Sequence, residues 1–330
     1  MKCTSKRIYQ FLSVLSVAVL LLESLTACGA KQYGFAYDRN RNNTSFSVAA
    51  SMEGSTLDPF AKSLCVVTQD VTTGTDVDMA DATAAGLFEI HSGKVIYAKN
   101  VHERLNPASL TKVMTALCAL KYGKLDDILT ATENVYVTES GAVKLGVTAG
   151  DTMTMEQALY GLMLKSANDV ANLVAEHIGG SVEGFVNLMN ETAASIGATN
   201  THFTNPHGLT DPEHYTTAYD MYLILNEAVK YDKFLELIQE QTYTSVYHDK
   251  DGNEKKIDLA NSNAYLKGEA IAPENVTVVG GKTGTTNAAG NCLILYCRNA
   301  SGDPYISIIL QAKDRTILYT EMTDLLNEIK

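Results

Sequence analysis

The order of extended and helical segments restricts the fold of this chain more than any other sequence feature. Residues 84–90 and 94–100 have the composition of strands and flank His91-Ser92-Gly93, which is a hairpin signal. A long helical block follows, then three further strands and a closing amphipathic helix over residues 316–329. Strands grouped in this way, rather than alternating with helices, predict an α+β fold with an antiparallel sheet. The three later strands are expected over residues 276–281, 291–298 and 305–311.

The helical block consists of segments whose apolar residues recur at helical spacing. In the first of them, Val113, Met114 and Leu117 share one face, and Gly123 ends the helix. A second hairpin is expected around Asp251-Gly252. The helices are expected over residues 109–122, 154–164, 170–178, 182–196 and 218–230, and the second hairpin joins residues 241–247 to 255–259.

The amino terminus is typical of an export signal. Lys2, Lys6 and Arg7 precede an apolar run over residues 11–22 that is too short to span a bilayer comfortably. The segment Leu25-Thr26-Ala27-Cys28 then resembles a bacterial lipoprotein signal, in which the cysteine is lipidated and becomes the first mature residue. Two acyl chains anchor a protein stably where one does not. The alternative is an ordinary secretory signal in which Cys28 is incidental.

A polar segment separates this leader from the first hairpin. Residues 29 to about 80 are rich in Ser, Thr, Asn, Asp and Gly, which is typical of a flexible tether, although Leu64–Val67 could add an edge strand. Three parts are therefore expected. They are a lipoprotein signal peptide over residues 1–27, a lipidated tether over 28–82 and a compact domain over 83–330.

Charge and cysteine use exclude several classes of protein. The formal net charge of -12 disfavours nucleic acid, because phosphate binding needs clustered Lys and Arg. No Cys/His spacing suggests zinc, and no metal or other cofactor is expected. Cys292 and Cys297 are five apart in an expected strand, so their side chains point to opposite faces, and Cys118 is expected in the core. A disulfide framework is therefore not expected, even with Cys65 included.

The first of three motifs is Ser109-Leu110-Thr111-Lys112, at an expected helix start. Residues three apart on a helix share a face, so the hydroxyl and the amine can meet. A Ser hydroxyl needs a base that takes its proton, and an amine serves if burial or nearby positive charge lowers its pKa. Alone the motif is weak, since roughly one Ser-x-x-Lys is expected by chance in a chain of this composition.

The second motif, Ser166-Ala167-Asn168, falls in a break between two expected helices, where side chains can project into a cleft. Ser166 could relay a proton, and Asn168 could hold a substrate amide and orient Lys112. The structural alternative is that Ser166 caps the following helix.

The third motif is Lys282-Thr283-Gly284-Thr285, expected at the end of the strand over residues 276–281. Gly281 and Gly284 remove side chains where another backbone could lie against the strand. Lys282 offers a positive charge and Thr283 a hydroxyl for one carboxylate. The alternative is a Gly-rich strand end with an exposed lysine.

Together, in this order, the three motifs resemble those of penicillin-binding proteins. The chain resembles serine-type D-alanyl-D-alanine carboxypeptidases of low molecular weight over about Thr83 to Lys330. The local sequences that carry this resemblance are residues 107–115, 166–169, 205–209, 281–286 and 289–292. The resemblance implies a β-lactamase/transpeptidase-like fold, in which an antiparallel sheet is flanked by helices and a helical subdomain. It also implies removal of the terminal D-Ala from a peptidoglycan stem peptide ending in D-Ala-D-Ala, with β-lactams as covalent inhibitors.

The resemblance implies roles for the residues around the nucleophile. Ser109 would be acylated, Lys112 would act as its base, and Ser166 would relay a proton to the leaving group. Asn168 would contact both the substrate and Lys112. His207 could instead be a base, but its Pro-His-Gly setting favours a structural turn.

The same resemblance implies a carboxylate site along the third motif. Lys282 and Thr283 would hold the terminal carboxylate of the substrate, with Gly284 leaving room for its backbone. The backbone N–H groups of the nucleophile and of Thr285 would form the oxyanion hole, and Arg315 would add positive charge.

One departure from the family concerns the membrane anchor. Many members carry a second, β-rich domain and an amphipathic membrane helix, whereas this sequence ends at Lys330 after the expected final helix. The lipid on Cys28 is expected to take over that role. It would hold an exported enzyme on the cell membrane, facing the cell wall or periplasm.

Other functions use similar residues. A murein endopeptidase would share the whole site, and a penicillin-sensing or peptidoglycan-binding lipoprotein would keep it without turnover. A class A β-lactamase would need a Glu-x-x-x-Asn loop after the second motif to activate water. The stretch after Ser166 offers four glutamates, and none is expected to begin such a loop: Glu176, Glu183, Glu191 and Glu213.

Overall fold

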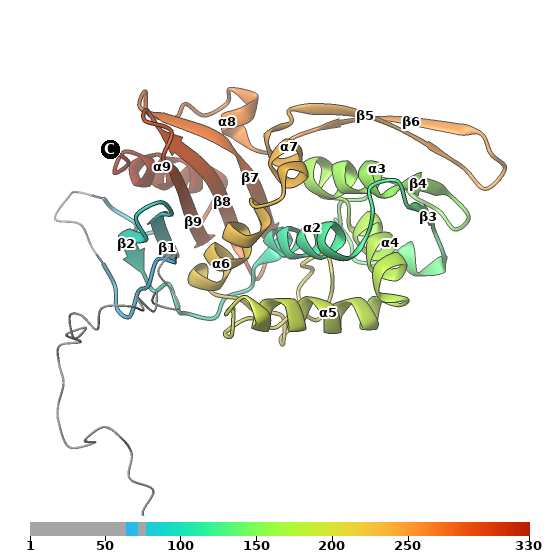
Figure 1. Cartoon of the computed structure of the whole chain (residues 1–330), viewed down its shortest axis with the longest axis horizontal. Coiled ribbons are helices and arrows are strands. Elements are labelled where there is room, and N and C mark those ends of the chain that lie inside the picture. The colour runs from blue at the N-terminus through green and yellow to red at the C-terminus, as the bar shows by residue number, and fades with distance from the viewer. Residues whose placement is uncertain (1–63, 72–76) are drawn as a thin grey trace, which may run out of the picture. The chain divides into compact units, whose positions relative to one another are not determined.

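A five-stranded antiparallel sheet forms the centre of the domain (Figure 1). The computed structural model describes residues 64–71 and 77–330. The strand order is β2-β1-β9-β8-β7, so a strand from the start of the domain pairs with one from its end, and β7 lies at an edge. The strands are β1 (Ala82–Glu89), β2 (Lys94–Lys99), β7 (Val276–Thr286), β8 (Gly290–Asn299) and β9 (Pro304–Ala312).

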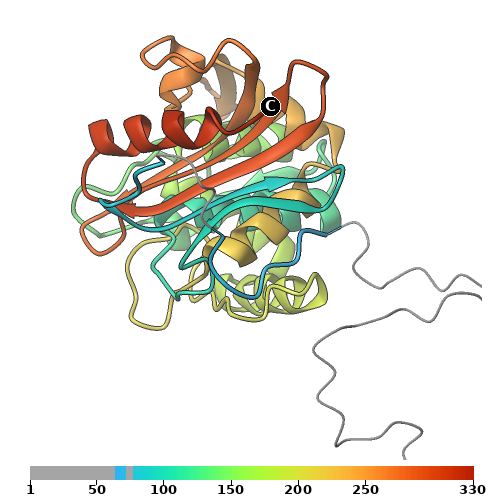
Figure 2. The same cartoon turned by 90° about the vertical axis from the view of Figure 1, so that its left-hand side faces the viewer.

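Both faces of this sheet are buried. Successive residues of a strand point to opposite faces, and accordingly Phe88 and Ile294 enter one apolar cluster while Leu87 and Leu295 enter the other. Helix α9 (Arg315–Leu326) packs across one face, which Figure 2 shows from the side. Each fully buried side chain of this size stabilises the fold by about 1.5–3 kcal/mol. The sheet is therefore a rigid support for the residues that β7 carries.

Helices cover the other face of the sheet. Helix α2 packs against α4, α5 and α6, and α6 contacts β1 and β9. Helix α3 begins with a capping box between Thr154 and Gln157 and continues into one π-helical turn. The helices are α2 (Thr111–Tyr122), α3 (Met155–Tyr160), the π-helical turn (Gly161–Lys165), α4 (Asn168–Gly179), α5 (Val182–Ser195), α6 (Ala218–Ala228) and α7 (Asp232–Gln239).

A second, smaller sheet lies beside the helical block. Its strand order is β3-β4-β5-β6, and the β5–β6 hairpin extends away from the central sheet in Figure 1. Its strands are β3 (Ile128–Thr130), β4 (Thr152–Thr154), β5 (Thr242–His248) and β6 (Glu254–Ala260), and the short helix α8 (Ala264–Lys267) follows.

The predicted α+β class, both hairpins and the antiparallel sheet are confirmed. The prediction that Leu64–Val67 adds a strand is wrong, because this segment is irregular and the bridge to β2 is made by Val71 with Ala98. Cys65 is instead buried, and its backbone N–H donates to the Tyr222 hydroxyl at 2.9 Å. Residues 64–71 therefore pack against the domain.

The four cysteines of the described residues are free and buried. Cys292 and Cys297 lie in the apolar clusters on opposite faces of the sheet, and Cys118 lies in the core. Among residues 64–71 and 77–330, no helix is long and apolar enough to cross a membrane. The predicted leader over residues 1–27, Cys28 and the first part of the tether lie outside the described residues.

Candidate active site

Ser109 lies in a single 3-10 turn, Ala108–Leu110, directly before α2. Ala108 has a positive φ of 48°, which costs a residue with a side chain about 1–3 kcal/mol. Gly208, with a φ of 85°, packs on this turn, and a Cβ there would lie 1.8 Å from the Ala108 carbonyl oxygen. Only glycine fits at that position, so the turn containing Gly208 holds the start of the helix in place.

The Lys112 side chain is fully buried one turn after Ser109. Its Nζ lies 3.0 Å from Ser109 Oγ, 2.7 Å from Asn168 Oδ1 and 2.6 Å from the His207 carbonyl oxygen. An amide oxygen and a carbonyl oxygen can only accept, whereas a hydroxyl can also donate. A neutral Lys112 amine would therefore donate to the two oxygens and accept the hydrogen bond from Ser109.

The surroundings of Lys112 favour that neutral form. Burial holds the pKa of its ammonium well below the usual range, and the nearby charge of Lys282 lowers the pKa further, against an opposing effect of Asp169. The structure therefore places an amine with a lowered pKa in hydrogen-bond contact with a serine hydroxyl.

Ser166 and Asn168 occupy the predicted break between helices, with the π-helical turn before them and α4 beginning at Asn168. Ser166 has a left-handed φ of 62°, and its Oγ accepts a hydrogen bond from Lys282 Nζ at 3.1 Å. The structural alternative, in which Ser166 caps α4, is wrong, because Ala167 holds the N-cap position and no side chain caps it. Ser166 instead points to the lysine of the third motif.

Lys282 and Thr283 lie inside β7, which corrects the prediction that this strand ends at Gly281. The Lys282 side chain is 1% exposed, and its Nζ donates to Ser166 Oγ and to the Thr283 carbonyl oxygen at 2.9 Å. Burial lowers the pKa of the Lys282 ammonium to about 7. Lys282 is thus a buried lysine, not the exposed lysine of the structural alternative.

Gly284 brings β7 into contact with the nucleophile. A Cβ on Gly284 would lie 2.9 Å from the Ser109 backbone nitrogen, which is closer than real Cβ atoms approach. Thr285 follows it, pairing with Asn291 of β8, and its Oγ1 donates to Asn291 Oδ1 at 3.2 Å. The three motifs therefore meet at one place, although they come from different parts of the chain.

Arg315 reaches this site through another residue. It is the first residue of α9, one position earlier than the predicted helix start. Its Nη2 donates to the Ser262 carbonyl oxygen at 3.3 Å and lies 3.5 Å from Glu269 Oε2. The Oγ of Ser262 is 2.6 Å from Thr283 Oγ1. Arg315 therefore adds positive charge beside the third motif without contacting the motif residues themselves.

His207 lies in a tight turn, as predicted. Its Nδ1 accepts the Leu209 N–H at 3.2 Å, and Asn205 Oδ1 accepts the Gly208 N–H at 2.7 Å. Burial, with the charges of Lys112 and His214, lowers the pKa of His207 to about 3, so its ring is neutral at physiological pH. Its contribution to the site is the backbone oxygen that accepts from Lys112.

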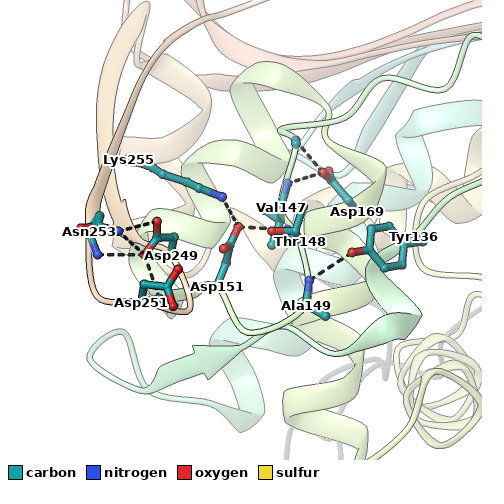
Figure 3. Close-up of polar contacts among 11 residues, drawn as sticks. Tyr136, Val147, Thr148, Ala149, Asp151, Asp169, Asp249, Asp251, Asn253 and Lys255 are labelled. Carbon is teal, nitrogen blue, oxygen red and sulfur yellow. Dashed lines mark hydrogen bonds and ion pairs between the residues drawn. The ribbon is translucent and has the colours of Figure 1, made fainter.

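A loop over residues 136–151 borders the site and is tied to its second motif (Figure 3). The buried Asp169 carboxylate accepts the backbone N–H groups of Leu145, Gly146 and Val147 at 2.8–3.1 Å. Asp151 accepts from the Thr148 N–H and from Lys255 Nζ of β6, at 2.9 and 2.7 Å. The loop is therefore held both by the residue after Asn168 and by the β5–β6 hairpin.

Sequence reasoning missed three contributors to this arrangement. The His207 carbonyl and Ser262 gave no sequence signal, because their contacts with Lys112 and Thr283 join distant segments. Asp169 directly follows Asn168 of the second motif, and this position was the one sequence feature that could have indicated its part in the site.

One of the four glutamates considered for a β-lactamase loop has the required spacing, because Asn187 follows Glu183 by four residues. The structure places both in helix α5, where both are exposed. Within the described part of the chain, neither residue forms a hydrogen bond with Ser109 or Lys112. The pair therefore forms an exposed helical face rather than a loop at the nucleophile.

Comparisons with known proteins agree with the fold and the motifs. The D-alanyl-D-alanine carboxypeptidase family model, Peptidase_S11, matches residues 70–314. The chain is 35% identical over 252 residues to the D-alanyl-D-alanine carboxypeptidase DacF of Bacillus subtilis, covering 74% of this chain and 61% of that protein. It is also 35% identical over 256 residues to DacC of Escherichia coli, covering 74% and 60%. The chain thus spans about three fifths of the length of these curated relatives.

A solved structure extends the agreement to three dimensions. The crystal structure of the Streptomyces K15 DD-transpeptidase aligns with a TM-score of 0.71 at 26% identity, covering 77% of this chain and 98% of that one. The family match includes all three motifs, from Ser109 to Thr285, within one span. The family expected from the motifs is confirmed, and the chain belongs to the Peptidase_S11 family of D-alanyl-D-alanine carboxypeptidases.

Proposed function

We propose that this chain is a serine-type D-Ala-D-Ala carboxypeptidase that removes the terminal D-Ala of a peptidoglycan stem pentapeptide through an acyl-enzyme on Ser109. The observation that carries the proposal is the 3.0 Å contact between Lys112 Nζ and Ser109 Oγ in a fully buried setting. A low-pKa amine beside a hydroxyl is the arrangement that activates a serine for attack on a carbonyl.

Acylation begins when neutral Lys112 takes the Ser109 proton as Oγ attacks the carbonyl of the penultimate D-Ala. The Asn168 amide and the His207 carbonyl hold the amine in place, and both stabilise the ammonium that forms. The backbone N–H groups of Ser109 and Thr285 receive the negative charge of the tetrahedral intermediate. The proximity of Gly284 to Ser109 supports this, since it places the next residue of β7 beside the nucleophile.

Lys282 and Thr283 hold the terminal carboxylate. A carboxylate beside Lys282 would raise the pKa of that ammonium and keep it charged, because an opposite charge favours the charged form. Arg315 adds its charge through Ser262. Ser166, which contacts Lys282, is the group that passes a proton to the departing D-Ala nitrogen as the peptide bond breaks. The Lys112 ammonium returns a proton to Ser166, so that Lys112 is neutral again when acylation ends.

Hydrolysis completes the cycle. Once D-Ala leaves, water enters the vacated space, Lys112 accepts its proton, and the hydroxide attacks the Ser109 ester. The shortened peptide is released, and the Ser109 oxygen recovers a proton from Lys112. No metal or cofactor enters this scheme.

The test is D-Ala release from a stem pentapeptide. The unmodified chain should release D-Ala over many turnovers, Ser109→Ala should abolish release, and Ser92→Ala, in the exposed β1–β2 turn, should match the unmodified chain. Cleavage of cross-linked dimers without D-Ala release would favour an endopeptidase. Binding of penicillin without peptide turnover would favour a sensor.

The proposal extends to the location of the enzyme. The lipoprotein-like segment before Cys28 supports export and anchoring of the chain on the outer face of the cell membrane by lipid on Cys28. Cys28→Ala should move the protein from the membrane to soluble or unprocessed fractions, while Cys3→Ala in the same leader should not. Unchanged fractionation of Cys28→Ala would contradict the anchor.

A further inference from the structure

The open edge of β7 sets the direction in which a bound peptide runs. Because β7 is the edge strand of its sheet, an extended peptide can add beside it as a further strand. In the proposed function, on which this inference rests, the terminal carboxylate lies at Lys282 and Thr283, and the scissile carbonyl lies at Ser109 and Thr285. Those two points fix the peptide antiparallel to β7. The stem residue that precedes D-Ala-D-Ala must then lie near Thr286 and beyond.

The structure has a hollow at that place. It measures about 500 Å³ and is lined by Thr285, Thr286 and the following turn, by Leu209-Thr210, and by the loop residues Glu139–Ala142. Glu139 is the only ionisable residue among those that line it. Its side chain is exposed and has no hydrogen bond or ion pair with any residue of the described part of the chain. The hollow therefore presents one carboxylate to whatever occupies it.

A neighbouring hollow of about 350 Å³ adds a second acid, Asp211, and is also bordered by Glu139. No lysine or arginine lines either hollow, and the one basic side chain present, His207, is neutral. The other end of the cleft carries Lys282, and Arg315 lies behind it, against the Ser262 carbonyl and Glu269. The cleft is thus positive where the carboxylate of the peptide lies and negative one to two residues upstream.

The loop that carries Glu139 is fixed before any peptide arrives. Asp169 holds its backbone at Leu145, Gly146 and Val147, and the Tyr136 hydroxyl accepts the Ala149 N–H at 3.5 Å (Figure 3). Lys144 Nζ donates to the Val137 carbonyl oxygen at 2.9 Å. A charge on a fixed loop selects a partner at lower entropic cost than one on a mobile loop.

We propose that Glu139 binds the cationic side chain of the stem residue that precedes D-Ala-D-Ala, so that the enzyme selects peptides with a free amine at that position. Asp211 strengthens the negative potential from the neighbouring hollow. The chemical class of the favoured substrate is a diamino acid at position three, with its side-chain amine unmodified.

Two pentapeptides test the proposal, one with lysine at the third position and one with Nε-acetyl-lysine, which keeps the aliphatic stem and the nitrogen but removes the charge. The lysine peptide should have a kcat/KM about two- to fivefold higher, the size expected of a solvent-exposed ion pair. Glu139→Gln should reduce the ratio to about one, whereas Glu133→Gln, at an exposed position that lines neither hollow, should leave it unchanged. Raising the salt concentration should also reduce the ratio, since salt screens exposed charges.

Acylation of Ser109 by a penicillin without a cationic side chain should be the same in all three proteins, which shows that Glu139→Gln is folded and active. An equal kcat/KM for the two peptides in the unmodified chain would overturn the inference, as would an unchanged ratio in Glu139→Gln. If neither peptide releases D-Ala, the proposed carboxypeptidase function fails by itself. The inference is then decided by competition of the two peptides with a fluorescent penicillin, where equal competition overturns it and stronger competition by the lysine peptide supports it.

Discussion

The two buried lysines of the cleft differ in what surrounds them. Lys112, on the first turn of α2, contacts one hydroxyl, one amide and one carbonyl, and Lys282 acts on it as a repelling charge. Lys282, on the edge strand β7, contacts the Ser166 hydroxyl and a backbone oxygen, with Thr283 beside it. Burial lowers the pKa of both. Lys112 has three neutral partners from the chain and Lys282 has two, and in the proposed function only Lys282 gains a further, charged partner, the carboxylate of the ligand.

Under the proposed function, this comparison teaches that one chemical group can serve two purposes in one cleft. A lysine that stays neutral is a base, and a lysine that becomes charged when its ligand arrives is an anion site. Ser166 and Lys282 are 116 positions apart in the sequence, and the hydrogen bond between their side chains joins the second motif to the third.

The largest effect is expected at Lys112. Lys112→Arg keeps the positive charge but supplies no neutral amine, so acylation by penicillin should fall about 10²- to 10⁴-fold. The rate is read from intact-mass spectra over time, and circular dichroism checks the fold. Near-normal acylation would show that another group is the base, with Ser166 the next candidate.

A smaller and more selective loss is expected at Lys282. Lys282→Gln should reduce kcat/KM for a D-Ala-D-Ala peptide by about 10- to 100-fold, the cost of one charge-assisted hydrogen bond. For the same peptide with a terminal amide in place of the carboxylate, Lys282→Gln should change kcat/KM by less than about threefold. Equal losses on both peptides would mean that Lys282 maintains the fold of the site rather than binding the carboxylate.

The pH dependence should separate the two lysines further. Lys282 has a pKa of about 7, so it is charged below pH 7 and loses its charge above it. The preference for the acid peptide over its amide should therefore decline, by up to about tenfold, between pH 6 and 9, because kcat/KM reports the free enzyme. A preference that stays constant over this range would contradict the assignment of Lys282 as the anion site.

The smallest effect is expected away from both lysines, at the ion pair between Lys255 and the buried Asp151. Lys255→Met should lower the free energy of unfolding by about 1 kcal/mol and Tm by about 2–4 °C. The expected loss is small because about a third of the Lys255 side chain is exposed, so solvent screens the ion pair. Lys256→Met, the exposed neighbour, serves as control. Penicillin acylation should change little, and a loss as large as that of Lys112→Arg would show that the hairpin controls the base.

Local spacing predicted one part of the site well. Ser109 and Lys112 are neighbours because residues three apart on a helix share a face, and the sequence alone contains that information. The strands and helices that carry the motifs were predicted from periodicity. β7 was predicted too short because Gly281, Gly284 and Lys282 are not typical strand residues, and its pairing with β8 outweighs that local preference.

Contacts between distant segments were beyond sequence reasoning. The three-residue strands β3 and β4 have too few residues for a periodic signal, and they form by pairing with each other and with β5. The approach of the His207 carbonyl to Lys112 depends on Gly208 packing against Ala108, which follows from the folded chain. The hollow at Glu139 likewise exists only after the loop folds against Asp169.

The central claim is that Ser109 forms an acyl-enzyme that water resolves quickly for a peptide and slowly for a β-lactam. With a peptide, D-Ala departs and leaves room for water. With a β-lactam, the leaving amine stays attached to the acyl group and obstructs water. The described residues around Ser109 also supply no glutamate hydrogen-bonded to the site that could activate it.

Intact-mass spectrometry with a penicillin, run beside D-Ala release from pentapeptide, tests this most directly. The account predicts a long-lived adduct of one penicillin on Ser109, absent in Ser109→Ala, together with steady release of D-Ala by the unmodified chain. Rapid turnover of many penicillin molecules without peptide cleavage would contradict it and indicate a β-lactamase.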